Sequence, residues 1–476
     1  MREAWEPKPG DRVIRHPRQE EMSPVRLTVT TRKVPSRAFA SPLILIYAFG
    51  GLITVGTLLL LLPISHRGTG FTPFVTALFT ATSATTVTGL VVQDTAEYWT
   101  RTGQVFILGL MFVGGLGFMT IATFLLILIG GRISLAQRLL VRESLGVNQL
   151  GGLVRITIGI VLVAAGIQVV GFAALFVRFS FLYSPAEAIW QAVFHAVSGF
   201  NNAGFVALKE SDGMAAFQED ELVLGIMFVL IVLGGIGYWV MVDVVKVRKF
   251  SLFTLTTKLV LIMTAALLLI GTFAFLAFEY QNPDTLGPLP VERKLMVSLF
   301  ESASGRTAGF STVDFGKTEQ HTNFFFTSLM FIGGASASVA GGIKINTFAV
   351  VLVAVLSTMK GRSRASAFGR EIPGAQVQRA MVIGALSIGL VFLVALALVV
   401  SQSGFDFIDL FFESVSAFGT VGLSTGLTSE LSSSGHVILI VTMFVGRLGP
   451  ITIGIALAQQ TRRDAYRYPQ ERVTIG

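Results

Sequence analysis

The chain contains no cysteine, and only 13% of its 476 residues are charged. The absence of cysteine excludes a disulfide framework and a thiolate metal site. Soluble domains carry about a quarter charged residues, so a globule of this composition would lack the polar surface that it needs in water. These shortages exclude a soluble enzyme, a disulfide scaffold and a disordered protein, and they indicate an integral membrane protein.

Apolar residues make up 52% of the chain and gather in long runs. Eight runs are about long enough to cross a bilayer, near residues 43–62, 104–129, 154–182, 222–245, 258–279, 323–355, 380–402 and 436–459. Between the members of each pair lies an apolar segment too short to cross, near 73–85, 187–199, 293–304 and 406–417. We predict an all-α polytopic membrane protein with eight transmembrane helices and four re-entrant pore helices.

The basic residues, which give a net charge of +8, are distributed unevenly among the connecting segments. If both termini are cytoplasmic, 26 of the 36 Lys and Arg residues lie in cytoplasmic segments and seven lie outside. This distribution is typical of the positive-inside rule. We therefore expect both termini inside, with a basic cytoplasmic tail over residues 1–40. The basic pI then reflects membrane topology, and we expect no nucleic-acid partner.

The four short segments end in lines that resemble one another. They read FTATSATTVTGL (79–90), FHAVSGFNNAGF (194–205), FESASGRTAGF (300–310) and FESVSAFGTVGL (412–423). Each line begins with Phe, has a serine four positions later and reaches a glycine nine or ten positions after the Phe. The serines and glycines are Ser83, Ser198, Ser304 and Ser416, and Gly89, Gly204, Gly309 and Gly422. We predict four helix–pore-loop–helix repeats around a pseudo-fourfold pore, over residues 41–150, 151–255, 256–372 and 373–476.

The repeated lines have the chemistry of a cation path. A short helix that points into the membrane presents the negative end of its dipole to the centre, and this end favours a cation. Glycine lets the following carbonyls turn inward without a Cβ clash, and four such stretches can replace the hydration shell of an ion. The filter then comprises Thr86, Val87, Thr88 and Gly89; Asn201, Asn202, Ala203 and Gly204; Arg306, Thr307, Ala308 and Gly309; and Gly419, Thr420, Val421 and Gly422. The alternative is a purely structural repeat whose small residues pack helices together.

The apolar run 323–355 is too long for one straight span. As continuous helix it would measure about 50 Å against a hydrocarbon core of about 30 Å. Its middle, GGASASVAGG at 333–342, is poor helix sequence. We predict a helix broken at mid-membrane by a loop beneath the filter, with gate residues Gly333, Gly334, Gly341, Gly342 and Lys344. A long tilted helix with an incidental kink is the alternative.

Several charged side chains lie at membrane depth, where charge is costly and is usually functional or paired. Arg447 occupies the repeat position of Gly115, Gly235 and Gly334, and we expect it to face the axis below the filter unless it pairs with a carboxylate. For Arg306 we expect a position behind the filter and an ion pair with a carboxylate, either Glu301 or Glu413. We interpret His195, Glu301 and Glu413 as groups that brace the filter.

The lines TTVTGL (85–90), FNNAGF (200–205), RTAGF (306–310), FGTVGL (418–423) and AGGIK (340–344) resemble the Trk/Ktr/HKT superfamily of potassium transporters over about residues 41–460. Eight spans without an additional N-terminal pair are similar to its KtrB branch. The resemblance implies potassium at the filter carbonyls, and glycine at all four filter positions is the pattern associated with potassium. It also implies that the 333–342 loop is an intramembrane gate and that Arg447 helps to occlude the path.

The same resemblance implies a homodimer in the bacterial plasma (inner) membrane, with one pore per subunit and a cytosolic nucleotide-binding ring of KtrA or TrkA type. GxGxxG and GKS/T patterns are absent, so we expect no nucleotide bound by this chain and ATP or ADP on the partner ring.

Two other classes of function are weighed against this one. A sodium-coupled or sodium-permeable secondary cation transporter with alternating access is the closer alternative, although its repeats would be inverted. An intramembrane enzyme needs a nucleophile–base pair or a metal cluster, and the five histidines form no HExxH motif. We expect no enzymatic activity.

Overall fold

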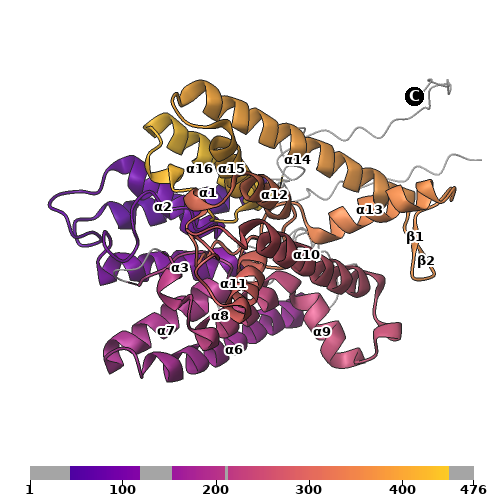
Figure 1. Ribbon diagram of the computed structural model, residues 1–476, viewed down its shortest axis with the longest axis horizontal. Helices are drawn as coiled ribbons and strands as arrows, with labels where there is room; N and C mark the ends of the chain where they lie inside the picture. Colours follow the sequence, from indigo (N-terminus) through magenta and orange to yellow (C-terminus); the bar gives the residue numbers. More distant parts are fainter. Residues whose placement is uncertain (1–42, 118–152, 209–212, 450–476) are drawn as a thin grey trace, which may run out of the picture. The chain divides into compact units, whose positions relative to one another are not determined.

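The computed structural model describes residues 43–117, 153–208 and 213–449. The basic tail expected over 1–40 lies outside the described residues, as do the distal parts of the expected spans 104–129 and 436–459. Apart from one small hairpin, the regular secondary structure of the described part is helical (Figure 1). This agrees with the predicted all-α class.

The helices of the described part are α1 (Leu43–Leu61), α2 (Phe74–Thr86), α3 (Arg101–Leu116), α6 (Leu153–Phe179), α7 (Pro185–Phe200), α8 (Glu221–Ile236), α9 (Tyr238–Val247), α10 (Leu255–Glu279), α11 (Val291–Ser304), α12 (Gln320–Phe331), α13 (Ile345–Met359), α14 (Gly374–Ser401), α15 (Phe407–Gly419) and α16 (Ser433–Leu448). Short 3₁₀ turns are η3 (Ala215–Phe217), η4 (Phe250–Leu252), η5 (Phe315–Lys317) and η6 (Leu427–Ser429). Strands β1 (Ser366–Ala367) and β2 (Arg370–Glu371) form an antiparallel hairpin with Ser366 opposite Glu371.

An outer helix, a short helix and an inner helix follow one another four times along the chain. The sets are α1–α2–α3, α6–α7–α8, α10–α11–α12 and α14–α15–α16. Each outer helix contacts the short helix of its own set. Each inner helix contacts the short helix of the next set: α3 with α7, α8 with α11, α12 with α15, and α16 with α2. The last contact returns to the first set, so the four sets close into a ring.

Among the described residues, three helical segments are long and apolar enough to cross a membrane by themselves: Thr157–Phe179, Leu255–Glu279 and Gly374–Ser401. A fourth candidate is the pair α8 and α9, which are bent by 97° with respect to each other. Shorter apolar helices are Ile46–Leu61, Arg101–Leu116, Ile345–Met359 and Ser433–Leu448.

The apolar run 222–245 is not one continuous helix, because the chain bends at Gly237 between α8 and α9. This glycine has φ +87° and ψ 147°, a conformation that is accessible to glycine and strained for residues with a Cβ. Gly117 (φ +78°) and Gly449 (φ +84°) cap α3 and α16 in the same way. The last glycine of the motifs GGLG, GGIG and GRLG therefore ends the inner helix at the same repeat position.

The third inner helix is interrupted earlier. Helix α12 ends at Phe331 and α13 begins at Ile345, so residues 332–344 form a non-helical segment inside the long apolar run. Ile332 and Ile343 form a parallel bridge that brings the two ends of this segment together. The glycine-rich sequence and the excess length predicted a broken helix here, and the helix is broken within this stretch.

The first glycine of the GGLG and GGIG motifs brings the inner helix close to the short helix of its own set. A Cβ added to Gly114 would lie 2.0 Å from the carbonyl oxygen of Thr85, and one added to Gly234 would lie 2.0 Å from that of Phe200. Such distances leave no room for any side chain. The leading Phe of every repeated line is buried beside these contacts: Phe79, Phe194, Phe300 and Phe412.

We predict that Gly234→Ala destabilises the protein by about 1–3 kcal/mol, because the new methyl group must displace the Phe200 carbonyl. Gly225→Ala in the same helix is the matched control, since no atom lies within 4 Å of its Cβ position. Alanine favours helix over glycine by about 1 kcal/mol, so this control should unfold at the same or a higher temperature. Thermal unfolding of the full chain in detergent measures both, and equal melting temperatures for the two variants would contradict the packing argument.

Candidate functional site

The four filter lines share an uncommon backbone conformation. The residue two positions before each filter glycine has a positive φ although it is not glycine: Val87 (57°), Asn202 (53°), Thr307 (72°) and Thr420 (48°). Each such residue costs of the order of 1–3 kcal/mol and persists only where the surroundings over-determine it. Strain at the same position in all four repeats indicates that the conformation of these loops is functional.

Each repeat serine ties its filter loop to the end of the short helix. The serine carbonyl oxygen accepts a hydrogen bond from the N–H of the residue before the glycine. The pairs are Ser83–Thr88 (2.8 Å), Ser198–Ala203 (2.8 Å), Ser304–Ala308 (2.9 Å) and Ser416–Val421 (2.9 Å). These bonds turn the chain sharply back after the helix.

The serine hydroxyls brace the far side of the same loops. Ser83 Oγ accepts the Gly89 N–H at 3.0 Å, and Ser416 Oγ accepts the Gly422 N–H at 3.2 Å. In the last three repeats the serine hydroxyl donates to the carbonyl just beyond the glycine: Ser198 to Phe205 (2.8 Å), Ser304 to Phe310, and Ser416 to Leu423 (2.6 Å). A small hydroxyl at this position, noted in the sequence as a repeat marker, therefore holds the filter loop in place.

The four filter glycines meet around one point. A Cβ added to Gly89 would lie 2.7 Å from the Ala203 oxygen, and one added to Gly204 would lie 3.1 Å from the Ala308 oxygen. The third and fourth repeats continue the series, with Gly309 against the Val421 oxygen at 2.4 Å and Gly422 against the Thr88 oxygen at 2.2 Å. The series closes on itself, so each glycine faces the carbonyl of the next repeat. We call this set the glycine ring: Gly89, Gly204, Gly309 and Gly422.

A Cβ at Gly89, Gly309 or Gly422 would overlap a carbonyl oxygen of the next repeat, and one at Gly204 would be crowded by its neighbours at 3.1 Å. All four glycines also have positive φ, from 70° to 99°. Backbone oxygens of Thr88, Ala203, Ala308 and Val421 lie at this ring, one from each repeat. Oxygen ligands from four repeats suit a hard cation stripped of its water.

Buried oxygens without a partner add to this oxygen-rich environment. Within the described residues, the filter lines contain four buried side-chain oxygens that have no hydrogen-bond partner: Thr85 Oγ1, Asn201 Oδ1, Thr307 Oγ1 and Thr420 Oγ1. Buried polar atoms are normally paired, and an unpaired one calls for a missing ligand, ion or water. Two of these oxygens face neighbouring elements, Asn201 Oδ1 toward Gly115 and Thr420 Oγ1 toward Gly341, so the backbone oxygens at the glycine ring are the better candidate ligands for a cation.

Two buried carboxylates brace the chain that leaves the filter. Glu301 Oε1 accepts the N–H and the hydroxyl of Thr312 at 2.7 and 2.8 Å, and Oε2 accepts the Ser311 hydroxyl at 3.1 Å. Glu413 makes the equivalent contacts in the fourth repeat, where it accepts hydrogen bonds from Ser424, Thr425 and Thr428. The carboxylates therefore support the filter from behind, as interpreted from the sequence.

His195 occupies the same repeat position in the second unit and is also buried. Its Nδ1 lies 2.8 Å from the Gln191 carbonyl oxygen, and the Gln191 side chain donates to the Ala207 carbonyl at 2.7 Å. Here the glutamine reaches the chain beyond the filter, while the histidine lies among the rings of Phe179 and Phe194.

The expected ion pair of Arg306 was wrong. Glu301 and Glu413 are occupied by hydroxyl and N–H donors, and no carboxylate pairs with Arg306 among the described residues. Its side chain instead lines a cavity of about 20 Å³ behind the filter, with Asn202 and Thr264. Such a cavity can hold one water molecule, which would serve the unpaired Arg306 Nε. Arg306 therefore shares this cavity with residues of α8 and α10 and has no carboxylate partner there.

The asparagines of the second line hold the filter with their amide nitrogens. Asn201 Nδ2 donates to the Val197 carbonyl at 2.9 Å. Asn202, in the amide orientation that suits its neighbours, donates to Ile231 at 3.2 Å and Gly199 at 3.1 Å. The Asn201 oxygen points toward α3, because a Cβ added to Gly115 would lie 2.1 Å from it.

We call residues 332–344, between α12 and α13, the intramembrane loop. The N–H groups of Ala335 and Val339 donate to the carbonyls of Gly235 (2.9 Å) and Gly234 (3.3 Å) at the end of α8. Because α8 stops at Gly237, these carbonyls have no later helical turn to pair with. The bend in the second repeat thus creates the docking surface for the loop of the third.

The intramembrane loop also lies directly against the start of the fourth filter line. A Cβ added to Gly341 would lie 1.9 Å from Thr420 Oγ1, and one added to Gly342 would lie 3.3 Å from Gly419 Cα. Both glycines were assigned to a gate from the sequence. Gly333 and Gly334 stand at the opposite end of the loop, where Gly333 N–H donates to Ile343 at 2.9 Å.

Arg447 joins the intramembrane loop to the first repeat. One guanidinium nitrogen donates to the Val339 carbonyl, and another donates to the Gly114 carbonyl at 2.6 Å. No carboxylate pairs with Arg447 among the described residues, so the alternative of an ion pair was wrong there. The charge of Arg447 at membrane depth marked it in the sequence as a candidate. Its two partners could not be predicted, because they are backbone carbonyls, which every residue has.

Lys344 places a second positive charge at the same loop. Its Nζ donates to the Ala340 carbonyl, so the side chain folds back along the segment that precedes α13. The Lys344 amine thus lies on the intramembrane loop, and the Arg447 guanidinium of α16 contacts the same loop through the Val339 carbonyl.

A closed ring of four helix–loop–helix sets, apolar outer helices and an oxygen-lined filter define a membrane cation-transport protein. The model of the TrkH family, described as cation transport protein, matches residues 23–467, and the chain belongs to this family. The resemblance drawn from the filter lines to the Trk/Ktr superfamily is confirmed.

Ktr system potassium uptake protein B of Bacillus subtilis (strain 168) is 40% identical over 438 residues, which cover 92% of this chain and 97% of that protein. Potassium/sodium uptake protein NtpJ of Enterococcus hirae is 38% identical over 459 residues, or 94% and 100% of the two chains. The crystal structure of the potassium transporter TrkH from Vibrio parahaemolyticus shares the fold, with a TM-score of 0.69 at 16% identity over 90% of this chain and 86% of that one.

We predict that Gly422→Ala abolishes cation uptake, because its methyl group would lie 2.2 Å from the Thr88 oxygen in the glycine ring. Gly426→Ala is the matched control: its φ is +90°, close to the +99° of Gly422, but no atom lies within 4 Å of its Cβ position. Both variants carry backbone strain of about 1–3 kcal/mol, and only Gly422→Ala fills the ring. Rubidium uptake at matched expression separates them, and equal uptake by the two variants would contradict a constriction at the ring.

Proposed function

We propose that the protein is the pore-forming membrane subunit of a bacterial potassium-uptake system. The observation that carries the proposal is the closed glycine ring, in which each repeat contributes one glycine and one carbonyl oxygen that lies against the glycine of the preceding repeat. An ion on the ring axis exchanges its water shell for oxygens from four repeats, which is how carbonyl filters select potassium. The names of the relatives from Bacillus subtilis and Enterococcus hirae, which include potassium uptake, support the same cargo.

The membrane arrangement that we propose has eight transmembrane helices and four re-entrant pore helices around a pseudo-fourfold pore. Helices α2, α7, α11 and α15 are the pore helices, and their carboxyl ends face the filter loops that follow them. Basic residues then lie at the cytoplasmic end and both termini are inside the bacterial plasma membrane. The cyclic contacts between successive helix sets support this arrangement.

Passage through the filter is controlled by the intramembrane loop. The loop contacts the fourth filter line through Gly341 and is tied to α3 by Arg447 through the Val339 carbonyl. Main-chain hydrogen bonds to α8 and the Arg447 side chain hold the loop, and Ala335 and Val339 pack in the hydrophobic core, so release of the loop has to break all of these contacts. Its glycines supply the backbone freedom for that movement.

The partners that we propose are a second copy of this chain and a cytosolic nucleotide-binding ring of KtrA or TrkA type. The Ktr system name of the Bacillus subtilis relative supports a multi-subunit assembly. ATP or ADP binds the ring in this scheme, and this chain binds no nucleotide. Release of the intramembrane loop is the event that the ring controls.

A sodium-coupled or sodium-permeable transporter is the second candidate. It is supported by the 38% identical relative that is named a potassium/sodium uptake protein. The filter observation favours a continuous potassium path over alternating access, because the four repeats contribute equivalent groups to one ring.

We expect this chain, expressed with its ring partner, to restore growth of potassium-uptake-deficient bacteria at low external potassium. Potassium and rubidium should compete for uptake much more strongly than sodium does, since the filter replaces the hydration shell of the larger ions. Isotopic rubidium influx measures this directly. Absence of rescue at normal expression would reject the proposed function, and strict coupling of influx to a sodium gradient would favour the second candidate.

We predict that Arg447→Ala raises the open-state flux, because it releases the Val339 and Gly114 carbonyls and removes a positive charge near the path. Arg447→Lys keeps the charge but cannot span both carbonyls, and its flux should lie between those of the wild type and the alanine variant. Rubidium influx per copy of protein tests both. An unchanged or lower flux in Arg447→Ala at normal expression would contradict the role of Arg447 as a tie on the loop.

A further inference from the structure

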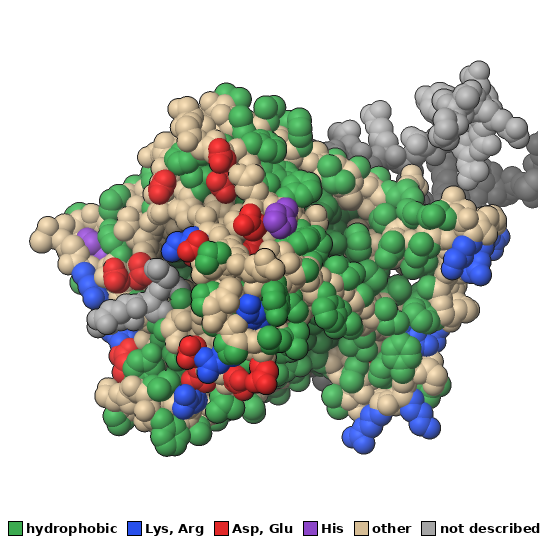
Figure 2. Space-filling model, in the orientation of Figure 1, with side chains coloured by type: hydrophobic (Ala, Val, Ile, Leu, Met, Phe, Trp, Pro, Cys, Tyr) green, Lys and Arg blue, Asp and Glu red, His purple; other side chains and the backbone are tan. Residues whose placement is uncertain are grey.

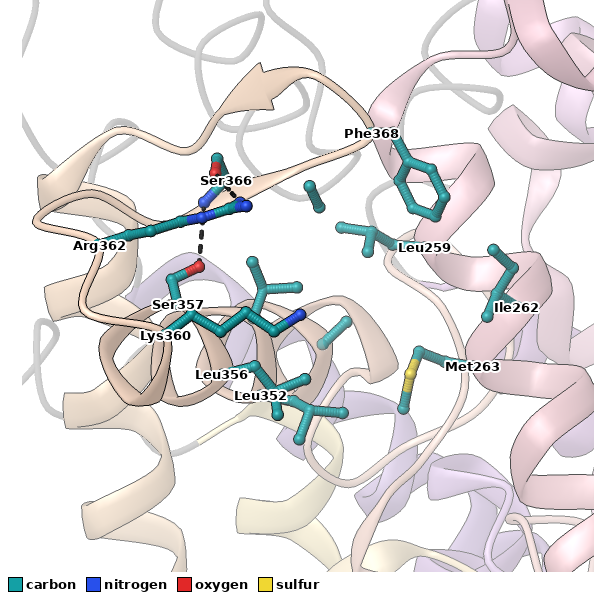
Figure 3. Close-up of a pocket in the computed structure, with 13 residues that line it drawn as sticks. Leu259, Ile262, Met263, Leu352, Leu356, Ser357, Lys360, Arg362, Ser366 and Phe368 are labelled. Atoms are coloured by element: carbon teal, nitrogen blue, oxygen red, sulfur yellow. Dashed lines mark hydrogen bonds between the residues drawn. The ribbon is translucent and has the colours of Figure 1, made fainter.

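A cavity of about 250 Å³ lies between α10, α13 and the β1–β2 hairpin (Figure 3). Its walls are apolar: Leu259, Ile262 and Met263 come from α10, and Leu352 and Leu356 come from α13. None of these residues belongs to the filter or to the intramembrane loop. The cavity adjoins α13, the helix that the intramembrane loop leads into.

The hairpin forms a fixed roof over this cavity. The Ser366 N–H donates to Ser357 Oγ on α13 at 3.3 Å, and Arg362 Nη1 donates to Ser366 Oγ at 3.3 Å. Figure 3 shows these two bonds joining the hairpin to the end of α13. The hairpin is therefore attached to the end of α13, and a displacement of α13 would displace the hairpin too.

The tip of the hairpin is attached to the opposite wall. Phe368 and Gly369 both have positive φ, at 50° and 72°, so the two strands are joined by a tight turn in which Phe368 is strained. Packing holds it there: the Phe368 ring lies 6.4 Å from the Phe250 ring, and Lys258 Nζ lies 5.7 Å from both rings. The hairpin thus bridges α13 and the start of α10 over the cavity.

The mouth of the cavity carries positive charge that no carboxylate balances. Lys360 and Arg362 line it and are exposed to solvent. Among the described residues neither forms an ion pair, and the one acidic residue of the hairpin, Glu371, is paired with Arg364 at 3.1 Å. Figure 3 shows the Lys360 side chain extending into the space between α13 and the hairpin.

At the opposite end of the molecule, basic residues form ion pairs with carboxylates. There Arg178 pairs with Asp220 at 2.7 Å and Arg293 with Glu219 at 2.8 Å. Figure 2 shows the same contrast: on the face in view, Asp and Glu gather toward the end with α2, α3 and α7, while Lys and Arg alone appear over the end with α9 and the hairpin. The unpaired charge at the cavity mouth is a local feature of one end.

We propose that this cavity binds an anionic phospholipid of the cytoplasmic leaflet. The apolar walls accept part of an acyl chain, and Lys360 and Arg362 bind the phosphate of the headgroup. Basic pockets between membrane helices on the cytoplasmic side recognise anionic headgroups in this way, and charge complementarity selects the occupant here. A zwitterionic lipid of equal chain length makes the same apolar contacts, but its binding free energy gains less from the charges of Lys360 and Arg362.

The bound lipid acts on the lower half of the broken helix. It contacts α10 and α13 together and lies under a hairpin attached to both, so it favours one spacing of these helices. Helix α13 continues directly from the intramembrane loop, and its position is therefore coupled to that loop. This consequence for flux rests on the proposed function, whereas the binding itself does not.

The binding is tested by native mass spectrometry of the full chain titrated with phosphatidylglycerol or with phosphatidylcholine of the same acyl chains. We expect tighter binding of phosphatidylglycerol. Lys360→Gln with Arg362→Gln should weaken that binding about 30-fold, the value expected for two basic residues near an anionic lipid. Lys246→Gln with Lys249→Gln is the matched control, because it removes two exposed basic residues at the same end that do not line the cavity.

A second variant tests the apolar part of the site. Ala367→Phe fills the cavity from the hairpin and should weaken phosphatidylglycerol binding while leaving both cations in place. If the Lys360/Arg362 variant and the Lys246/Lys249 variant lose phosphatidylglycerol binding equally, the effect is one of general surface charge, and the proposed site is overturned. Saturation of the site by inorganic phosphate alone would overturn it too, as would a Lys360/Arg362 variant that binds lipid normally but no longer binds the cytosolic ring.

The flux consequence is tested with the same variants in liposomes of phosphatidylglycerol or phosphatidylcholine. We expect rubidium flux of the wild type to differ between the two lipids and that of the Lys360/Arg362 variant to differ less. Flux that is equal in both lipids, with selective binding intact, would overturn the coupling to the loop. Absence of flux in every lipid would count against the proposed function and leave the binding result standing.

Discussion

Four glycine backbones meet at one point, and the rest of the structure accommodates that meeting. A Cβ at Gly422 would lie 2.2 Å from the Thr88 oxygen, and one at Gly309 would lie 2.4 Å from the Val421 oxygen, so the close approach of the four loops depends on glycine. To reach it, each filter loop must reverse within a few residues of its pore helix, which forces a non-glycine residue into a strained positive φ. The serine of each repeat, and Glu301 and Glu413 in the last two, supply the hydrogen bonds that hold that strain.

The third repeat departs from the other three, and the proposed control element lies at this asymmetry. Three inner helices end at a glycine of positive φ, whereas the third stops at Phe331 and inserts the intramembrane loop. The loop uses carbonyls that the bend at Gly237 leaves unpaired and accepts Arg447 from the fourth repeat. The pseudo-symmetric filter therefore rests on an asymmetric support, because the third repeat contributes a loop where the other three contribute a helix end.

Much of the filter was predictable because its constraints are local. Glycine at a close approach and serine at a turn recur at constant spacing, so four aligned lines reveal them without a structure. The bend at Gly237 was missed because hydropathy is continuous across it. The structure separates two roles, since Gly234 packs and Gly237 ends the helix. The partner of Arg306 was mispredicted because nearby carboxylates were counted by charge, while hydroxyl and N–H donors had already occupied them.

The central claim is that the glycine ring coordinates the transported ion. The most direct measurement is the anomalous scattering of thallium, a potassium substitute, in crystals of the full chain. The account predicts a peak on the ring axis, in contact with the carbonyl oxygens of Thr88, Ala203, Ala308 and Val421, that potassium displaces more readily than sodium. Peaks only at sites away from these four oxygens, in crystals of protein that is active in uptake, would contradict it.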